Sequence, residues 1–328
     1  MNVNQRLAVS IILCVFTMGP AAVDTDPVIT DNKLLADLPA GSIVAWGYDG
    51  DGQVSNIPMG DDFVAVAAGD KFSLALRQDG SIEAWGGDLQ RQVRDAPKGN
   101  DFVAISAGQS HGLALRKDGT VVSWGNDSGR SMSDAVVGSS GQVSATPSYN
   151  DIIAISAGGE HNLALRRNGT LVAWGVDLHR RVSDTPREDG FIKISAGTYH
   201  NLAMRDDSTL VAWGRDMIGS VTNTPTDERF VSIAAGGRHN LALRKDGSIY
   251  GWGWDLRNEV SGMPNGSGFI QVSVGYTHSI AMKDDGTLVA WGWDRMDSGQ
   301  MSNTPDNVSF VAIATGALHN LAIRKKAP

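Results

Sequence analysis

The chain has 328 residues, of which 41% are hydrophobic and 20% are charged, as is ordinary for a globular protein. Its formal net charge of -8 and its isoelectric point near 5.3 exclude the strongly basic surface that nucleic-acid-binding proteins present, so we expect no nucleic-acid partner. The 39 glycines exceed the usual share and indicate a chain with many turns.

The N-terminus has the layout of a secretory signal peptide. Arg6 precedes an apolar run over residues 7–18, and small residues follow it as far as Ala22. The alternative is an uncleaved membrane anchor, although the run is shorter than the roughly 20 residues that a spanning helix needs.

This N-terminal pattern divides the chain into three parts. We expect residues 1–22 to be removed during export, residues 23–40 to form a polar leader, and residues 41–328 to form one domain. The mature protein would be secreted or periplasmic, with no membrane span. Cys14 is the only cysteine, so the mature chain would contain no disulfide.

A repeated module begins at Gly41, and the stretch 230–264 shows it most clearly. An apolar run ending in Ala-Gly leads through a turn to HNLALR, and Asp246-Gly247 then leads to SIYGWG. Asp-Gly between two β-prone runs indicates a hairpin, because both central residues tolerate positive φ. A polar loop with Asp255 and a short Glu-Val-Ser segment follow. We therefore expect four short strands in one small antiparallel sheet.

The two halves of the module recur seven times each, out of phase. A glycine placed three residues before a histidine or an aromatic residue marks each front half. Trp-Gly marks each back half, and its spacings along the chain are 39, 39, 50, 39, 39 and 39 residues. The tryptophans are Trp46, Trp85, Trp124, Trp174, Trp213, Trp252 and Trp291.

The ends of the array complement each other. The first Trp-Gly strand, at about 42–47, has no front half, and the C-terminal segment HNLAIRKKAP has no Trp-Gly strand. Pairing of these two ends would close the array into a ring and remove its exposed sheet edges. The sequence therefore predicts an all-β fold, a seven-bladed β-propeller. An open β-solenoid is the alternative, and the half-module offset argues against it.

The repeat also carries a family resemblance. The pattern AGxxHxLALRxDGxxxxWG resembles the repeats of the regulator of chromosome condensation and covers essentially all of Gly41 to Arg324. Segments such as VAWGYDGDGQVSNIP are more similar to secreted bacterial members, including the β-lactamase-inhibitory propeller proteins, than to the nuclear exchange factor. The resemblance implies a seven-bladed propeller that works by binding another protein.

Four departures from the pattern stand out. Phe72 replaces histidine in the first module, and Asp207-Ser208 replaces Asp-Gly in the fourth. The second module has eleven extra residues between Trp124 and Val143, and the last Trp-Gly loop has two extra residues around 296–299. Insertions in repeat arrays usually lie in loops on one face, often the binding face, where the longer one could act as a clamp.

Two polar residues recur in almost every module, and their repetition favours a structural role. The aspartate three residues after each tryptophan is expected to bond nearby backbone amides in an Asx turn. Asp49 and Asp51 together could attract calcium. Two carboxylates fall short of the six or more oxygens that this ion takes, so no metal site is expected. The repeated histidines resemble a catalytic or metal ring, yet we expect each to brace the backbone of an adjacent turn: His111, His161, His200, His239, His278 and His319.

No residue set stands out as catalytic. The segment GQSHG around Ser110 matches the Gly-x-Ser-x-Gly nucleophile motif. That motif needs a strand-to-helix turn, whereas Ser110 is expected between two strands of a repeat. We therefore expect no enzyme activity and no cofactor.

The positions that vary between modules point to one face. Because strands alternate in direction, the turn before each histidine and the loop after each Trp-Gly should emerge together. Tyrosine, tryptophan and arginine gather there in neighbouring modules, and these residues dominate the energetic centres of protein interfaces. The predicted partner-binding residues are Tyr48, Tyr199, Arg238, Trp254, Tyr276 and Trp293.

The function predicted from these patterns is binding of a protein or peptide partner through that face. A carbohydrate-binding, lectin-like propeller is the first alternative, because aromatic side chains also stack on sugar rings. An enzyme with a site at the ring axis is the second alternative.

Overall fold

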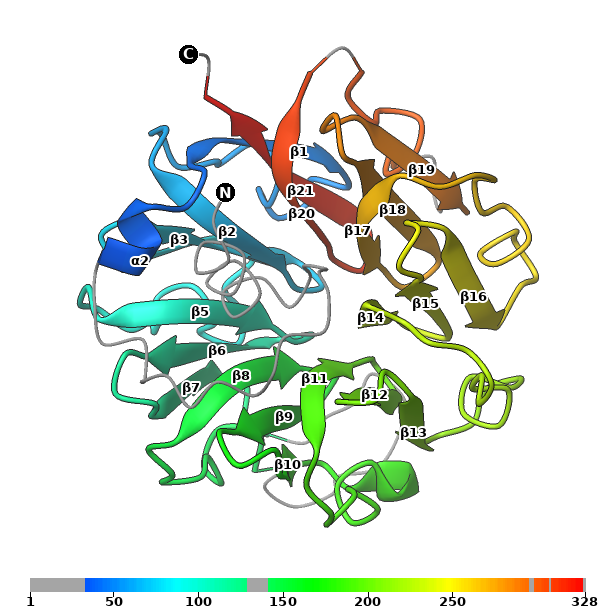
Figure 1. Ribbon diagram of the computed structural model, residues 1–328. Coiled ribbons are helices and arrows are strands. Elements are labelled where there is room, and N and C mark those ends of the chain that lie inside the picture. Colours follow the sequence, from blue (N-terminus) through cyan, green and yellow to red (C-terminus); the bar gives the residue numbers. More distant parts are fainter. Residues whose placement is uncertain (1–32, 129–140, 295–297, 307, 327–328) are drawn as a thin grey trace.

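The computed structural model describes residues 33–128, 141–294, 298–306 and 308–326. Within these ranges the regular structure is almost entirely antiparallel β-sheet, in five three-stranded sheets and one six-stranded sheet. Two short helical segments, α2 (Lys33–Ala36) and η1 (Leu178–Arg180), complete it. Figure 1 shows the sheets arranged around a common centre.

Each three-stranded sheet is formed by three consecutive strands. They are β5 (Phe102–Ala107), β6 (His111–Arg116) and β7 (Val121–Gly125); β8 (Ile152–Ala157), β9 (His161–Arg166) and β10 (Leu171–Gly175); β11 (Phe191–Ala196), β12 (His200–Arg205) and β13 (Leu210–Gly214); β14 (Ser232–Ala235), β15 (His239–Leu243) and β16 (Ile249–Gly253); and β17 (Phe269–Val274), β18 (His278–Lys283) and β19 (Leu288–Gly292).

The six-stranded sheet joins the two ends of the repeat array. Its order is β20-β21-β1-β2-β3-β4, from β20 (Phe310–Thr315), β21 (His319–Lys325), β1 (Gly41–Gly47), β2 (Phe63–Ala68), β3 (Phe72–Arg77) and β4 (Ile82–Gly86). The predicted pairing of the first and last strands is present, because β1 pairs with β21 along its whole length, from Gly41 with Lys325 to Gly47 with His319. In Figure 1 the blue β1 accordingly lies beside the red β21. A single residue pair joins β1 to β2, and none of the sheets closes on itself.

The Asp-Gly hairpins form as predicted, but each module has three strands instead of four. In the module of β14 to β16, Asp246-Gly247 makes the turn, and the side chain of Asp246 accepts the N–H of Ser248. The Glu-Val-Ser segment forms turns instead of a fourth strand. Its backbone N–H groups are already used, because Asp255 Oδ1 accepts those of Val260 and Ser261 at 2.9 and 2.8 Å.

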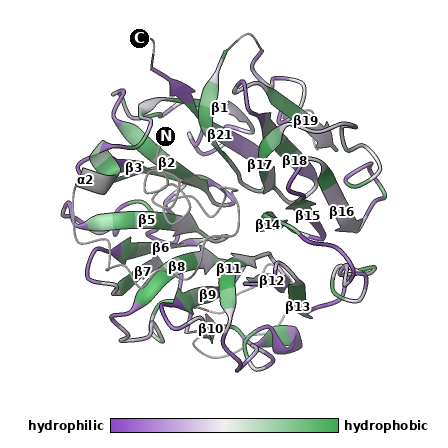
Figure 2. Ribbon diagram, in the orientation of Figure 1, coloured by the Kyte–Doolittle hydropathy of each residue, from purple (hydrophilic) through white to green (hydrophobic). Residues whose placement is uncertain are grey.

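The hydrophobic core lies between neighbouring sheets. Leucines of β3 pack with Phe102 and Trp124 of the next sheet. Within the six-stranded sheet, Trp85 of β4 packs with Leu321 and Ile323 of β21. In Figure 2 the hydrophobic residues accordingly follow the strands, while the connecting loops are mostly hydrophilic. No module could bury these faces alone, so each depends on its neighbours.

Glycines let the inner ends of the sheets approach closely at the centre. A Cβ atom on any of them would lie within 2.7 Å of the carbonyl oxygen of the next glycine in the series, and the last of them meets the first in the same way. A side chain at these positions would force the sheets apart. The series is Gly69, Gly108, Gly158, Gly197, Gly236, Gly275 and Gly316.

The segment before the first strand contacts the first module. Leu35 and Leu38 are buried in its core, and Gln78 Nε2 donates to the carbonyls of Ala36 and Leu38. No helix in the described residues is long and apolar enough to cross a membrane. The predicted signal peptide lies outside the described residues, as do most of the second-module insertion and residues 295–297 of the last loop.

Candidate functional site

The turns before the histidines and the loops after Trp-Gly lie on one face, as predicted, and we call it the loop face. In each module the residue after Trp-Gly donates its N–H to the carbonyl of the residue before the histidine position. Trp254 thus bonds to Arg238 at 3.1 Å, and Arg215 bonds to Tyr199 at 2.9 Å. The two most variable positions of every module are therefore held side by side.

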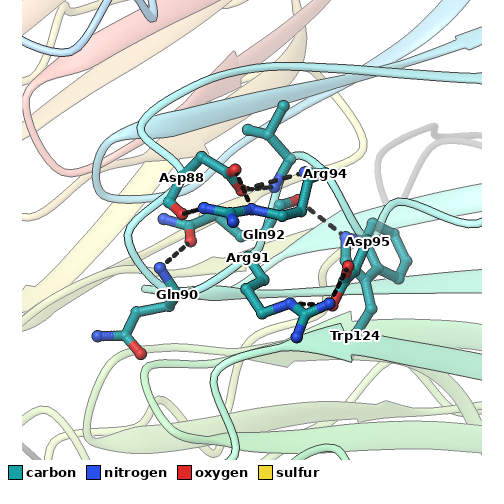
Figure 3. Close-up of polar contacts among 8 residues, drawn as sticks. Asp88, Gln90, Arg91, Gln92, Arg94, Asp95 and Trp124 are labelled. Carbon is teal, nitrogen blue, oxygen red and sulfur yellow. Dashed lines mark hydrogen bonds and ion pairs between the residues drawn. The ribbon is translucent and has the colours of Figure 1, made fainter.

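Aspartate folds each Trp-Gly loop into a compact turn. Figure 3 shows the loop after β4, in which Asp88 Oδ1 accepts the N–H groups of Val93 and Arg94 at 2.9 and 3.0 Å. At the base of the same loop, the carbonyl of Gln92 accepts the indole N–H of Trp124 from the next sheet at 2.9 Å. Burial opposes ionisation of Asp88, but the backbone N–H groups and the Arg94 guanidinium together outweigh it and lower the pKa of this carboxyl. The repeated aspartates therefore have the structural role predicted for them.

The histidines brace neighbouring modules, although their partners differ from those predicted. Each histidine bonds through Nε2 to a polar side chain of the next module, at 2.5–2.9 Å, and not to a turn's backbone. In the pair His161–Asn201, the Asn201 amide donates to the carbonyl of Arg181, so its oxygen faces the histidine and Nε2 must donate. Burial lowers the pKa of His161 to about 3, which keeps the ring neutral.

In one place of the series both members of the hydrogen-bonded pair are replaced by residues with no polar side chain. Phe72 stands in the histidine position of the first module, and Gly112 stands in the second module where the others carry asparagine or serine. Phe72 therefore leaves no polar partner without a hydrogen bond. This matched replacement supports a packing role for the whole series.

Four of the six predicted binding residues form a connected group on the loop face, which we call the Arg–Tyr–Trp cluster. Its members are Tyr199, Arg238, Trp254 and Tyr276. The hydroxyls of Tyr199 and Tyr276 are 3.2 Å apart, and Arg238 Nη2 donates to the Tyr276 hydroxyl at 3.3 Å. The Arg238 guanidinium also lies over the Trp254 ring, 4.9 Å from its centroid, and 5.4 Å from the centroid of Tyr276.

A glycine allows this group to span three modules. Tyr199 and Tyr276 belong to modules separated by the module of β14 to β16, where Gly237 stands between them. A Cβ at Gly237 would lie 2.8 Å from the Tyr276 ring. The absent side chain thus lets Tyr276 cross to Tyr199. Burial, followed by the hydrogen bond to Tyr276, raises the pKa of Tyr199 to about 12, so the Tyr199 hydroxyl stays protonated at neutral pH.

Arg238 retains unused hydrogen-bonding capacity. Its Nε is buried without a hydrogen-bond partner, and no carboxylate of the described chain lies within ion-pair distance of it. A buried guanidinium N–H without an acceptor is unfavourable. The cluster therefore contains one guanidinium N–H that no acceptor of the described residues satisfies.

The other two predicted residues lie outside the cluster. Trp293 is covered by Arg257, whose guanidinium lies 4.6 Å from the ring centroid. Arg257 belongs to the same loop as Trp254, so this pair continues the surface. Within the described ranges Tyr48 makes no hydrogen bond or ring contact with the cluster, and its hydroxyl lies over Gly50 of its own loop.

Comparison with known proteins identifies the repeat. Residues 102–129, 152–178, 230–259 and 269–300 match the model of the regulator of chromosome condensation (RCC1) repeat. The chain contains RCC1 repeats. No curated protein matches it by sequence.

Solved structures show the same RCC1 propeller fold. Prp20p from Saccharomyces cerevisiae is 18% identical, with a TM-score of 0.72 over 89% of this chain and 93% of its own. Yeast RCC1 (Prp20) bound to Kap60 is 19% identical, with a TM-score of 0.73 over 95% and 96%. Human WBSCR16 is 16% identical, with a TM-score of 0.66 over 87% and 99%. At these identities the likeness is one of fold.

Sequence reasoning missed two arginines of the loop face. Arg257 covers Trp293, and Arg215 lies 5.5 Å from the centroid of Tyr199. Each follows a Trp-Gly pair by one or four residues, in the variable loop. Charge at these loop positions, beside an aromatic residue of the same or the next module, was the available signal.

Two features were considered above as signs of other chemistry: the nucleophile-like segment at Ser110 and a metal site. Ser110 lies in the turn between β5 and β6, and its carbonyl accepts the N–H of Asn126 at 2.9 Å. The segment therefore lacks the strand-to-helix turn of the nucleophile motif. The described ranges contain no group of three or more histidine, cysteine or acidic side chains placed to hold a metal ion.

Proposed function

We propose that this RCC1-repeat protein is a secreted or periplasmic binding protein, without catalytic activity, that holds a protein or peptide on its loop face. Its scaffold would be seven three-stranded blades closed into a ring. The pairing of β1 with β21 and the close approach of Gly316 to Gly69 support closure. The signal-like sequence before residue 23 supports export.

The Arg–Tyr–Trp cluster is the observation that carries this proposal. Its side chains are only partly buried, and they come from three successive modules. Arg238 is held over two rings yet keeps a buried N–H without an acceptor. Tyrosine, tryptophan and arginine in such a rigid group are the residues that typically dominate a protein interface.

The structural relatives also support a protein partner. The Prp20p structure was described together with binding to Gsp1p and histones, and yeast RCC1 was solved bound to Kap60. These proteins share the fold of this chain at low identity, so they support the class of partner and not its identity.

The stacking geometry favours a protein over a sugar. One face of Trp254 is covered by Arg238, and one face of Trp293 is covered by Arg257. A sugar ring needs an open aromatic face, whereas a protein interface uses both the ring edges and the guanidinium donors. The carbohydrate-binding alternative therefore becomes an outcome of the test.

The test is a comparison of variants against a captured partner. The mature protein would first be used to isolate its partner from the cognate culture medium or cell envelope. The triple variant Trp254→Ala, Tyr276→Ala, Trp293→Ala should then bind at least about 100-fold more weakly, since one such residue is often worth about 2 kcal/mol or more. Unchanged affinity would contradict the proposal.

A matched control exists on the opposite side of the molecule. Tyr149 is 42% exposed, and Arg166 lies 4.2 Å from its ring centroid, so this pair resembles those of the loop face. Tyr149→Ala should leave the affinity unchanged. A glycan array probed with both variants tests the alternative: glycan binding lost only in the triple variant would favour a lectin.

A further inference from the structure

A small opening lies at the centre of the loop face, and its wall is mostly backbone. Seven short segments surround about 140 Å³, one from the start of each Gly-to-His turn. Glycine and alanine predominate among the lining residues. The larger polar side chains in the wall are those of Asp70, Gln109 and Tyr276. Because Tyr276 also belongs to the Arg–Tyr–Trp cluster, the opening adjoins the proposed binding surface.

Asp70 is a carboxylate without a counter-charge in this wall. The nearest basic residue, Lys71, is directed elsewhere, since its Nζ pairs with the carboxylate of Asp51 at 3.3 Å. No hydrogen bond or ion pair to the Asp70 carboxylate occurs in the described part of the chain, although its backbone N–H donates to Gln109 O at 3.2 Å. The lining segments contain no lysine or arginine. Burial raises the pKa of Asp70 to about 7, and Lys71 offsets this only in part.

We propose that this opening receives a primary ammonium group, carried by a lysine side chain of the protein partner, with Asp70 as its counter-charge. The inference rests on the proposed function, because it names the chemistry of one contact on the same face. The Asp70 carboxylate would accept hydrogen bonds from the ammonium group. The Tyr276 hydroxyl takes no part, because it is directed toward Tyr199 and Arg238.

The size and shape of the opening favour lysine over arginine. A volume of about 140 Å³ is close to the roughly 150 Å³ of a cavity that admits a benzene molecule. An ammonium is a compact point charge on a flexible stem, whereas a guanidinium needs a planar, two-pronged acceptor. The methylene stem would lie against the alanine and glycine rim, as the stems of buried lysines do.

The electrostatics of Asp70 provide a readout that a merely structural residue would not give. A carboxyl whose pKa is raised in the folded state binds more protons there than in the unfolded chain. Ionisation then costs stability as the pH rises from about 4 through 7. Asp70→Asn should therefore raise the melting temperature at pH 8 and leave it nearly unchanged at pH 4. A structural Asp70 would give a lower melting temperature at pH 8.

Binding is tested with a pair of probes that differ only in charge. N-acetyl-lysine methylamide and N-acetyl-norleucine methylamide would be titrated into the full mature protein at pH 8, with backbone amide NMR shifts as the readout. The lysine probe should shift the signals of Gly69, Gly108 and Gly316 saturably, and the norleucine probe should not. Asp70→Asn should weaken the lysine probe at least tenfold.

Two further variants change the positive charge near Asp70 and leave Asp70 itself in place. Lys71→Met removes the cation that acts on Asp70 in the described residues and should tighten binding of the lysine probe. Asp51→Asn frees the Lys71 ammonium to approach Asp70 and should weaken binding of the lysine probe. Asp95→Asn, in an exposed pair with Arg91, is the matched control and should have no effect.

The outcomes separate this inference from the proposed function. Equal response to the two probes, or unchanged lysine binding by Asp70→Asn, overturns the ammonium site. If Asp70→Asn also leaves partner affinity intact while the triple aromatic variant abolishes it, the binding face stands and only the site at the axis fails. If the triple variant binds the partner normally, the proposed function fails.

Discussion

Arginine–aromatic pairs occur on both faces of the propeller, but they are of two kinds. On the face of the Asp-Gly turns, the pair recurs at one position of the repeat, as in Arg77 over Phe63 and Arg116 over Phe102. Each of these arginines is also paired with an acid, Asp62 or Asp101. On the loop face, Arg238 has no carboxylate partner in the described residues, and no other module has arginine at its position of the repeat.

The difference separates scaffold from site. A contact that recurs in most modules and has its charge neutralised needs nothing from outside the molecule. A contact that occurs once and lies on variable loops is not needed by the repeat, and here it leaves a buried donor without an acceptor in the described residues. The same interaction type therefore stabilises the fold on one face and, we infer, binds a partner on the other.

The largest expected effect concerns the histidine series, a scaffold contact that recurs in six modules. Burial lowers the pKa of His111 to about 4 and those of His161, His239 and His319 to about 3, from an ordinary value of 6.5. Between these values the unfolded chain binds more protons than the folded one. Stability should therefore fall as the pH drops below about 6.5, by up to about 1.4 kcal/mol per pH unit for each buried histidine.

Urea unfolding at pH 7.5 and at pH 5.0 measures this loss. The midpoint should be much lower at pH 5.0. The variant His161→Phe removes one titrating group and should reduce the pH dependence, although it also loses the bond to Asn201. Equal midpoints at the two pH values would show that the histidines are not held neutral.

A smaller effect is expected from breaking one repeated arginine contact. Arg77→Ala removes the stacking on Phe63 and the ion pairs with Asp62 and Glu83. The free energy of unfolding should fall by about 1 kcal/mol, because partly exposed pairs of this kind contribute little individually. Arg238→Ala should leave it nearly unchanged. Thermal unfolding of both variants distinguishes them, and a larger loss for Arg238→Ala would reverse the assignment of scaffold and site.

Much of the scaffold could be predicted from the sequence because its signals are local and repeated. Asp-Gly turns, the Trp-Gly strands and the pairing of the two chain ends all follow from short patterns. The fourth strand was wrongly predicted at Glu259-Val260-Ser261, because the Asp255 carboxylate, five and six residues earlier, takes up the N–H groups of Val260 and Ser261. A contact of that kind has no signature within the segment itself.

The binding surface was predictable in its residue types and face but not in its connections. Tyr199 meets Tyr276 only because Gly237 between them has no side chain, and that depends on how three modules are stacked. Tyr48 shares the face but not the group, because its ring lies over its own loop. Arg257 was missed because it acts on a tryptophan of the next module.

The smallest expected effect is a change in stability at one turn of the scaffold. Ser208 occupies a turn position where φ is 68°, while Gly247 and Gly286 fill the equivalent position in later modules. A left-handed conformation costs a residue with a side chain roughly 1 kcal/mol, partly offset by the greater freedom of glycine in the unfolded chain. Ser208→Gly should therefore raise the melting temperature slightly and leave partner affinity unchanged. A fall in stability would mean that the serine side chain has a role of its own.

The central claim is that arginine–aromatic pairs stabilise the fold on one face and bind a partner on the other. Its most direct test is the affinity of the captured partner for Arg238→Ala and Arg77→Ala, measured side by side by calorimetry. Each variant removes an arginine stacked on aromatic rings, so the change in chemistry is matched. The account predicts at least about tenfold weaker binding for Arg238→Ala and unchanged binding for Arg77→Ala. Equal affinities for the two variants, or a loss confined to Arg77→Ala, would contradict it.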